Sequence, residues 1–380
     1  TMASSASETE VMKILNSVRD GGDKAILELT QRLDGCNLNA LNVSEKEFLD
    51  AEQLVSVELK EAIQIAKSNI ERFHMAQLVG SNTIETMPGV KCWRKSVAIE
   101  KVGLYIPGGT APLFSTVLML GLPAKIAGCR QIVLCSPPGK DGNIHPAILY
   151  TARECGITEV YKVGGAQAIA AMRYGTETIS SVSKIFGPGN SWVTMAKQLI
   201  AKDGFPIDIP AGPSELAVYA DESVPASFVA ADLLSQAEHG ADSQVVVVSI
   251  NRIVIDKIIL EVERQLELLP RKDIARRALA ESLAVVVADE NDAMDLLNDY
   301  APEHLILACK NAGGLCDQVI NAGSVFIGGW SPESAGDYAS GTNHTLPTNG
   351  NAKGWSGVSL DSFVKKITFQ EITQEGLSRI

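Results

Sequence analysis

The regular alternation of strand-like and helix-like segments from Gly103 onward constrains the fold most strongly. A first set predicts strands over 103–106, 131–135, 159–163 and 184–186, and helices over 111–127, 146–154, 166–173 and 190–201. A second set predicts strands over 216–219, 244–249, 284–288, 305–309 and 324–328, and helices over 225–239, 252–269, 271–282, 291–300 and 312–322. Such alternation is typical of doubly wound parallel sheets. We therefore expect two Rossmann-like α/β units, related by duplication.

The segments outside these two sets predict a helical start and a polar end. Up to about Ala76 the apolar residues recur at helical spacing, and short strand-like runs follow at 90–93 and 97–99. After Gly329 the chain is polar and glycine-rich to about Gly357. A charged segment follows, which we expect to form an arm that packs on another subunit.

Composition and charge exclude several classes of partner. The chain has 380 residues and a formal net charge of −12, with no block of Lys and Arg, which argues against binding to nucleic acid or anionic membranes. No apolar stretch reaches the roughly 20 residues of a membrane span. Residues 1–5 lack the features of a signal peptide, and the seven cysteines form no CxxC pair. We expect a soluble cytoplasmic protein in a reducing compartment.

Three strand ends of the first set carry glycine, which lets a backbone approach a phosphate closely. These turns are 107–109, 164–165 and 187–189. Each opens a helix whose N-terminal amides favour an anion. Tyr105 offers a ring for stacking, and Gln167 and Asn190 offer amides at the helix starts. Because no GxGxxG motif is present, two interpretations stay open: a dinucleotide site, or glycines that only serve tight turns.

The end of the helix predicted over 225–239 carries possible metal ligands. We expect Ser223 as its N-cap, Pro225 in its first turn and Gly240 at its end. Gln236 and His239 are three residues apart, so their side chains share one face of the last turn. An amide oxygen and an imidazole can coordinate a cation. The alternative is that His239 pairs with the free carbonyls at the helix end.

Two further polar segments complete a candidate acid–base and metal site. Glu303 and His304 stand side by side at the entrance of a strand, where they could divide two proton transfers or form an ordinary polar junction. Asp337 and His344 lie in a long loop over 331–348, and loops of this length are often functional. Imidazole, carboxylate and amide groups together suit a divalent metal beside a general acid or base.

The other reactive side chains suggest structural roles. His74 and His145 stand in helix-like or turn surroundings and are interpreted as structural. Cys135 ends a strand, where a nucleophile for aldehyde oxidation could stand. No basic residue is near it in sequence, so we expect it to pack in the core.

Taken together, these segments resemble the histidinol dehydrogenase family over nearly the whole chain. The resemblance is carried by GLYIPGG at 103–109, GPGN at 187–190, PAGPSE at 210–215, LSQAEHG at 234–240, APEHL at 301–305 and the loop over 329–348. It implies oxidation of L-histidinol to L-histidine through the bound aldehyde, with two NAD+ and one zinc ion per subunit. The implied zinc ligands are Gln236, His239 and Asp337. Glu303 and His304 are the implied acid–base pair.

The resemblance also implies the remaining contacts and the domains. Ser214 and His344 would line the substrate pocket with Gln236, His239, His304 and Asp337, and Tyr105, Gln167 and Asn190 would contact NAD+. The expected domains are an N-terminal helical arm over 1–25, a first α/β domain with the zinc and acid–base residues over 26–104 and 214–357, a second α/β domain with the NAD+ contacts over 105–213, and the start of a C-terminal dimerisation arm over 358–380.

One departure from the family pattern concerns the end of the chain. The family's fourth zinc ligand is a histidine in a C-terminal Glu-Gly-Leu-x-x-His motif that reaches into the partner of a homodimer. Here 375–380 reads EGLSRI, with Ile380 in place of the histidine, so we expect that motif beyond Ile380 and weak zinc binding without it. Two rival hypotheses remain: a dehydrogenase of another amino alcohol or a sulfonated diol on the same scaffold, and a catalytically silent assembly or regulatory protein.

Overall fold

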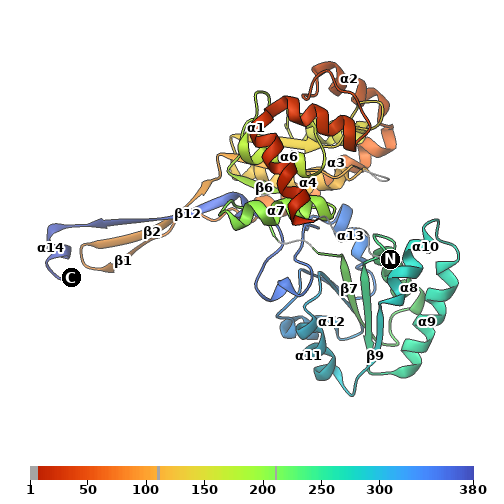
Figure 1. Cartoon of the computed structure of the whole chain (residues 1–380). Coiled ribbons are helices and arrows are strands. Elements are labelled where there is room, and N and C mark those ends of the chain that lie inside the picture. Colours follow the sequence, from red (N-terminus) through yellow and green to blue (C-terminus); the bar gives the residue numbers. More distant parts are fainter. Residues whose placement is uncertain (1–6, 109–111, 210–211) are drawn as a thin grey trace. The chain divides into compact units, whose positions relative to one another are not determined.

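The structure, a computed structural model, describes residues 7–108, 112–209 and 212–380. Residue contacts divide the chain into two compact units (Figure 1): unit 1 holds residues 1–208 and 358–380, and unit 2 holds residues 209–357. This division differs from the expected domains, because residues 26–104 belong to unit 1 together with 105–208. The expected N-terminal arm is the first part of α1, Glu8–Leu33, which packs on α6 (Gly165–Tyr174) and α7 (Ser191–Lys202) of unit 1.

Three serine-capped helices begin unit 1. The side chains of Ser7, Ser44 and Ser56 accept hydrogen bonds from the first turns of α1, α2 (Glu45–Leu54) and α3 (Val57–Met75). Such caps satisfy backbone N–H groups that have no partner inside the helix. The helices predicted up to about Ala76 are therefore confirmed.

Unit 1 is built on a four-stranded parallel sheet with the order β5-β4-β3-β6. The strands are β3 (Lys101–Tyr105), β4 (Gln131–Ser136), β5 (Glu159–Lys162) and β6 (Lys184–Phe186). The intervening helices are α4 (Phe114–Ala127), α5 (Pro146–Glu154), α6 (Gly165–Tyr174) and α7 (Ser191–Lys202). Counted within the unit the strand order is 3-2-1-4, so the chain reverses its winding between β3 and β6.

Unit 2 repeats this order with one strand more. Its parallel sheet has the order β11-β10-β7-β8-β9, which is 5-4-1-2-3 within the unit. The strands are β7 (Glu215–Ala220), β8 (Gln244–Ser249), β9 (Leu283–Val286), β10 (His304–Ala308) and β11 (Ser324–Ile327). The helices are α8 (Ala226–Ala237), α9 (Arg252–Leu266), α10 (Lys272–Ala280), α11 (Glu290–Tyr300), α12 (Ala312–Leu315) and α13 (Glu333–Tyr338). The predicted pair of Rossmann-like parallel-sheet units is confirmed.

Alternation along the central strands of unit 2 decides which side chains face which helices. Leu216 and Val218 join the buried cluster that includes α8 residues, whereas Ala217 and Tyr219 join the cluster on the opposite face. Along β10, Ile306 belongs to the α8 side. Because successive side chains of a strand point to opposite faces, His304 at the start of β10 also faces α8.

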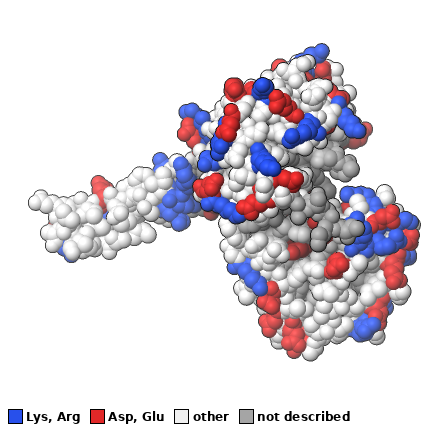
Figure 2. All heavy atoms as spheres, in the orientation of Figure 1, with Lys and Arg blue, Asp and Glu red and all other residues white. Residues whose placement is uncertain are grey.

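A separate antiparallel ribbon in unit 1 was only partly predicted. It consists of β1 (Thr83–Met87), β2 (Val90–Ala98) and β12 (Val364–Ile372), and the short helix α14 (Gln374–Leu377) follows it. The two short strands predicted at 90–93 and 97–99 are one strand. Apolar side chains such as Ile84 and Ile372 stay exposed, and uncharged atoms cover most of the ribbon face seen in Figure 2. A strand that is exposed on both faces packs on no core, so its apolar and polar residues need not alternate. The sequence therefore did not predict β12.

Several predicted boundaries are wrong for local reasons. The helix predicted over 225–239 begins after Pro225 and ends at Ala237, and Ser223 donates to Asp221 instead of capping it. The helix predicted over 312–322 stops at Leu315 and continues as a 3-10 turn, Cys316–Gln318. The loop over 331–348 contains α13. Gly109 and residues 111, 210 and 211, which belong to predicted motifs and the start of a predicted helix, lie outside the described residues.

Within the described ranges, no helix combines the length and the apolar composition that crossing a bilayer requires.

Candidate functional site

The predicted acid–base residues of unit 2 lie at the amino end of its sheet. His304 is the first residue of β10 and pairs in register with Leu216 of β7 and Ser324 of β11. The helix α8 returns the chain from the end of β7 to the start of the parallel strand β8, so its C-terminal end lies at this same edge. The topology thus carries Gln236 and His239 toward His304.

The helix α13 adds carboxylates to the same place. It packs on α8, and the Glu333 N–H donates to the carboxylate of Asp232 on α8 over 3.3 Å. Glu333 and Asp337 are four residues apart and share one helix face. One potential ligand atom each from His239, Glu333 and Asp337 lies within 4.8 Å of the other two. These three residues could therefore hold one metal ion.

Unsatisfied polar atoms support the same interpretation. The Nε2 of Gln236 lies 3.2 Å from the Nδ1 of His239, while its Oε1 is buried without a hydrogen-bond partner among the described residues. Both carboxylate oxygens of the fully buried Glu333 also lack a donor among the described residues, apart from a proton shared with Asp337. Burying such groups unpaired is costly unless a cation or ligand satisfies them. The donor set, with one imidazole, carboxylates and an amide oxygen, fits zinc.

His304 is held between two carboxylates. Its Nε2 lies 3.3 Å from the Oδ1 of Asp337, and its Nδ1 lies 3.2 Å from the carbonyl oxygen of Glu215 and 3.8 Å from the Oε2 of Glu303. Burial disfavours the imidazolium, but Asp337 and Glu303 outweigh it and raise the pKa of His304 to about 9. Without a metal beside Asp337, the ring is therefore held as the imidazolium at physiological pH.

Glu303 is a buried acid with a raised proton affinity. Its Oε2 accepts a hydrogen bond from the N–H of Glu215 over 3.0 Å. Burial raises the pKa of Glu303 to about 7, although His304 and the Glu215 N–H oppose the shift. A carboxyl group with a pKa near neutrality can both take and release a proton at physiological pH.

His344 and Ser214, the two residues predicted only as substrate contacts, join this cluster through the backbone. The Nδ1 of His344 lies 2.9 Å from the carbonyl oxygen of Asp337. Burial lowers the pKa of both His344 and His239, which favours the neutral imidazole that can bind a metal or a ligand. Ser214 directly precedes Glu215, the residue that contacts both Glu303 and His304.

The structure thus gathers the residues predicted in unit 2, with Ser214 linked to the others only through the backbone of its neighbour Glu215. They are Ser214, Gln236, His239, Glu303, His304, Asp337 and His344. Sequence reasoning missed Glu333 because α13 was taken as loop. Its spacing of four from Asp337 is the signal that could have identified it.

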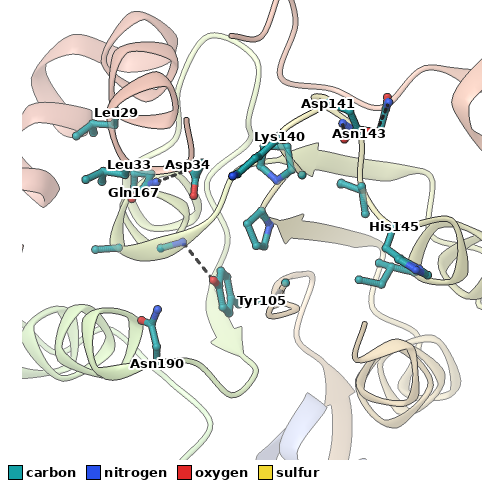
Figure 3. Close-up of a pocket in the computed structure, with 18 of the residues that line it drawn as sticks. Leu29, Leu33, Asp34, Tyr105, Lys140, Asp141, Asn143, His145, Gln167 and Asn190 are labelled. Atoms are coloured by element: carbon teal, nitrogen blue, oxygen red, sulfur yellow. Dashed lines mark hydrogen bonds between the residues drawn. The ribbon is translucent and has the colours of Figure 1, made fainter. Parts of the chain in front are cut away.

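A separate cavity lies at the carboxyl end of the unit 1 sheet (Figure 3). Its volume of about 1670 Å³ exceeds the roughly 300–1,000 Å³ of typical small-molecule pockets. Tyr105, Gln167 and Asn190, the predicted dinucleotide contacts, all line it. The sheet edge and the cavity agree with the general rule that ligands of such sheets bind beyond the carboxyl ends of the strands.

Each of these three side chains is tied to a helix start. The Tyr105 hydroxyl accepts from the Gly165 N–H over 3.1 Å, and burial raises the pKa of Tyr105 to about 12, so its proton remains available for donation. Asn190 caps α7 by accepting from the first-turn N–H groups. Gln167 is buried with its Oε1 unpartnered in the described chain, and its Nε2 lies 3.5 Å from Asp34.

The far walls of the cavity come from segments that no motif indicated. Leu29, Leu33 and Asp34 approach from the end of α1, and Lys140 and Asn143 from the loop between β4 and α5 (Figure 3). The contribution of the α1 residues depends on the packing of α1 against α6, which sequence spacing does not show.

The residues predicted to be structural are bonded or buried. His74 is buried and pairs with Gln77 near the end of α3. His145 caps α5 and also lines the cavity. Cys135 is fully buried in the unit 1 core, and burial raises the pKa of its thiol far above the physiological range. The core role predicted for Cys135 is confirmed, since the thiolate needed for nucleophilic attack is strongly disfavoured.

Comparison with known proteins assigns the family. The family model described as histidinol dehydrogenase matches residues 1–380. The chain belongs to the histidinol dehydrogenase family. The histidinol dehydrogenase of Bacteroides fragilis is 59% identical over 370 residues, covering 97% of this chain and 86% of the relative. That of Vibrio parahaemolyticus is 53% identical over 372 residues, covering 97% and 85%.

Solved structures support the same assignment. The crystal structure of histidinol dehydrogenase from Elizabethkingia anophelis matches with a TM-score of 0.98 and 53% identity, covering 100% of this chain and 88% of that one. An acetylating aldehyde dehydrogenase from Geobacillus thermoglucosidasius, 15% identical with a TM-score of 0.55 and covering 97% of this chain and 92% of that one, shares the fold alone. As a member of the histidinol dehydrogenase family, the chain is an NAD-dependent oxidoreductase acting on a CH–OH group, and the predicted family is confirmed.

Proposed function

We propose that this chain oxidises L-histidinol to L-histidine through bound L-histidinaldehyde, with two NAD+, as the last step of histidine biosynthesis. The observation that carries the proposal is the convergence of Gln236, His239 and Asp337 beside the Glu303–His304 pair. A same-scaffold dehydrogenase of another alcohol is not favoured, because the family match and the relatives all name histidinol dehydrogenase.

Zinc would be held by Gln236, His239 and Asp337, with Glu333 as a further carboxylate within reach. When bound there, zinc would fix the amine and imidazole nitrogens of the substrate, and its charge would lower the pKa of His304 toward neutrality.

His304 and Glu303 divide the proton transfers. In the first oxidation, His304 takes the proton of the substrate hydroxyl, and a hydride passes to NAD+ from the carbon that bears this hydroxyl. Asp337 stabilises the resulting imidazolium across 3.3 Å. In the second oxidation, Glu303 takes a proton from the water that adds to the aldehyde carbon, and the hydrated carbon then gives up a second hydride. One water is consumed, two NADH are formed, and no covalent cysteine intermediate is needed.

NAD+ would occupy the unit 1 cavity. Tyr105 would donate its hydroxyl proton, and the amides of Gln167 and Asn190 would bind polar groups of the dinucleotide. The N-terminal amides of α6 and α7 would favour its phosphates. The glycine turns at the starts of these helices leave room for that approach.

A second copy of the chain is the proposed partner of the antiparallel ribbon. Its exposed apolar side chains include Ile84, Ile367, Phe369 and Ile372. A three-stranded ribbon without a core of its own gains little from folding alone, so burial against another subunit would stabilise it. The homodimer is therefore our proposal, and the cytoplasmic location expected from the composition and the cysteines is proposed with it.

The decisive assay follows NADH formation with histidinol, NAD+ and Zn2+. The proposal requires two NADH per histidinol, whereas turnover of other alcohols alone would contradict it. Glu303→Gln should slow aldehyde oxidation more than alcohol oxidation, because only the second step needs this base. In the unaltered enzyme the aldehyde step should accelerate as pH rises through about 7, where Glu303 loses its proton, and the variant should lack this limb. Equal loss in both half-reactions would refute the division of tasks.

A further inference from the structure

The turn from β6 into α7, residues 187–190, supports two of the proposed NAD+ contacts. Gly187 has a φ of 121°, and a Cβ on it would overlap the carbonyl oxygen of Tyr105. The backbone of the turn therefore lies directly against the last residue of β3. Three residues later, Asn190 caps α7. A small displacement of this turn would move Asn190 and open the packing around Tyr105.

One buried ion pair binds both polar groups of Gly187. The Nζ of Lys197 donates to the Gly187 carbonyl oxygen over 2.8 Å, and the Oδ2 of Asp208 accepts from the Gly187 N–H over 2.7 Å. The other oxygen of Asp208 pairs with Lys197. The two side chains are 4% and 1% exposed. Lys197, Asp208 and Gly187 thus form a closed polar loop inside the unit 1 core, which we name the Gly187 clamp.

The two charged residues come from different segments: Lys197 from α7, and Asp208 from the segment that follows α7. Lys197 stands in the second turn of α7 on a face that otherwise buries apolar residues such as Ala196 and Ile200. Asp208 comes from the segment after α7, which extends the sheet: Ile207 bridges Ile185 of β6, and the Asp208 N–H donates to the Ile185 carbonyl over 3.0 Å. This register places the carboxylate of Asp208 beside Gly187.

Stability alone does not explain such a pair. Removing two charges from water costs free energy, and well-packed apolar residues often replace a buried ion pair without loss of stability. What an apolar pair cannot do is bind the N–H and C=O of a particular glycine. Charge-assisted hydrogen bonds are short and directional, so they fix the position of the turn.

We propose that the Gly187 clamp positions the dinucleotide pocket: Lys197 and Asp208 hold the 187–190 turn, and through it Asn190 and Tyr105, in the arrangement that binds NAD+. Both are positioning residues, since neither lines the cavity. The proposal rests on the NAD+ pocket proposed above. It predicts that loss of the clamp weakens NAD+ binding and leaves zinc binding in unit 2 unchanged.

The test replaces the clamp as a pair, Lys197→Met with Asp208→Leu, in the full chain. Replacing both leaves no unpaired buried charge, but the N–H and C=O of Gly187 lose their partners. The variant should therefore unfold several degrees below the parent and stay folded at the assay temperature, which a thermal melt checks first. Its Kd for NAD+, measured by calorimetry, should rise at least tenfold, while its zinc content stays unchanged. An NAD+ Kd within twofold of the parent in the folded variant would overturn the proposal.

A matched pair elsewhere in unit 1 controls for general loosening. Lys67 and Glu154 join α3 to α5 with side chains 20% and 28% exposed, and neither lines the cavity. Lys67→Met with Glu154→Leu should leave the Kd for NAD+ unchanged. If this control weakens NAD+ as much as the clamp variant, the effect is structural and the proposal fails.

A second measurement separates positioning from indirect damage. If the clamp acts through Asn190, the loss caused by Asn190→Ala and the loss caused by the clamp variant should not add when combined. Fully additive losses would contradict positioning. Asp208→Asn keeps an oxygen for the Gly187 N–H but leaves the buried charge of Lys197 without its counter-ion, so it should loosen the turn. The amides of Gly187, Gly189 and Asn190 should exchange faster and the Kd for NAD+ should rise. Unchanged exchange and affinity would count against the clamp, and this measurement does not depend on the folding of the pair variant.

Asn190→Ala with an intact clamp distinguishes the two proposals. If it weakens NAD+ while the clamp variant does not, only the positioning role is lost. If neither Asn190→Ala nor Gln167→Ala changes the Kd for NAD+, the pocket itself is misassigned.

Discussion

Units 1 and 2 share a strand order but gather their proposed functional side chains at opposite ends of their sheets. In unit 1, Tyr105, Gln167 and Asn190 follow the carboxyl ends of strands and face a cavity. In unit 2, His304 begins β10 and the helix end with Gln236 and His239 returns to this amino edge. The same topology therefore supports two different kinds of site.

The residues at the strand ends explain the difference. At the carboxyl end of β7, Asp221 accepts from the Ser223 N–H over 2.8 Å and from the Lys310 N–H over 2.9 Å, so it ties the β7 and β10 ends together. In unit 1, Gly108 after β3 and Gly165 after β5 border the cavity instead. Strand order marks where a crevice can form, but the side chains decide which edge is used.

The largest expected effect is the loss of turnover when His304 is replaced. Replacing it with Asn removes the proposed base for alcohol oxidation, and turnover should fall by about 10²–10⁴-fold, the usual range for a general base. The Kd for NAD+ should not change, because the cavity belongs to the other unit. Steady-state turnover and calorimetry check this together, and a variant that keeps more than a tenth of the activity would remove His304 from its role.

Asp337→Ala should affect the metal next. Loss of a ligand should weaken zinc by more than the roughly 10–100-fold typical of outer-sphere partners. Competition with a chromophoric chelator measures the affinity. Glu238→Gln, a neighbouring carboxylate outside the metal cluster, is the matched control and should retain zinc. Equal zinc affinity in Asp337→Ala and the parent would place the metal elsewhere.

Gln167→Ala tests the other end of the comparison. Loss of a buried amide that binds the dinucleotide should raise the Kd for NAD+ about tenfold, equivalent to about 1.4 kcal/mol. Zinc content should be unaffected. A variant that loses zinc but keeps NAD+ affinity would reverse our assignment of the two sites.

The smallest effect is expected at Asp221. Asp221→Asn weakens the hydrogen bonds from the Ser223 and Lys310 N–H groups that join the ends of β7 and β10. It should lower the free energy of unfolding by about 1 kcal/mol. Thermal unfolding measures the change. Affinities for zinc and NAD+ should match the parent, and a change in either would show that this edge also binds a ligand.

Much of the fold follows from local pattern. Helix Pro146–Glu154 and strands Lys184–Phe186 and Gln244–Ser249 occur where periodicity and flanking turns predict them. The ribbon did not follow, because β12 has exposed side chains on both faces and takes its place from pairing with β2, about 270 residues earlier. The grouping of 26–104 with 105–208 likewise depends on long-range packing, above all that of α1 on α6.

Candidate site residues could be predicted where they lie close together in the sequence. Residues that only the fold brings to the site could not be predicted. Gln236 with His239, and Glu303 with His304, are visible as neighbours in sequence. Glu333 was missed because the helix after Pro332 has only six residues, which is too few for a helical pattern to show in the sequence. Asp34 and Lys140 reach the cavity only through tertiary packing, which leaves no mark on local spacing.

The most direct test of this division is the position of the metal in crystals of zinc-loaded enzyme, located by anomalous scattering at the zinc edge. We predict one peak per subunit among the side chains of Gln236, His239 and Asp337, next to His304. A zinc peak in the unit 1 cavity, or at any place away from these four residues, would contradict the account.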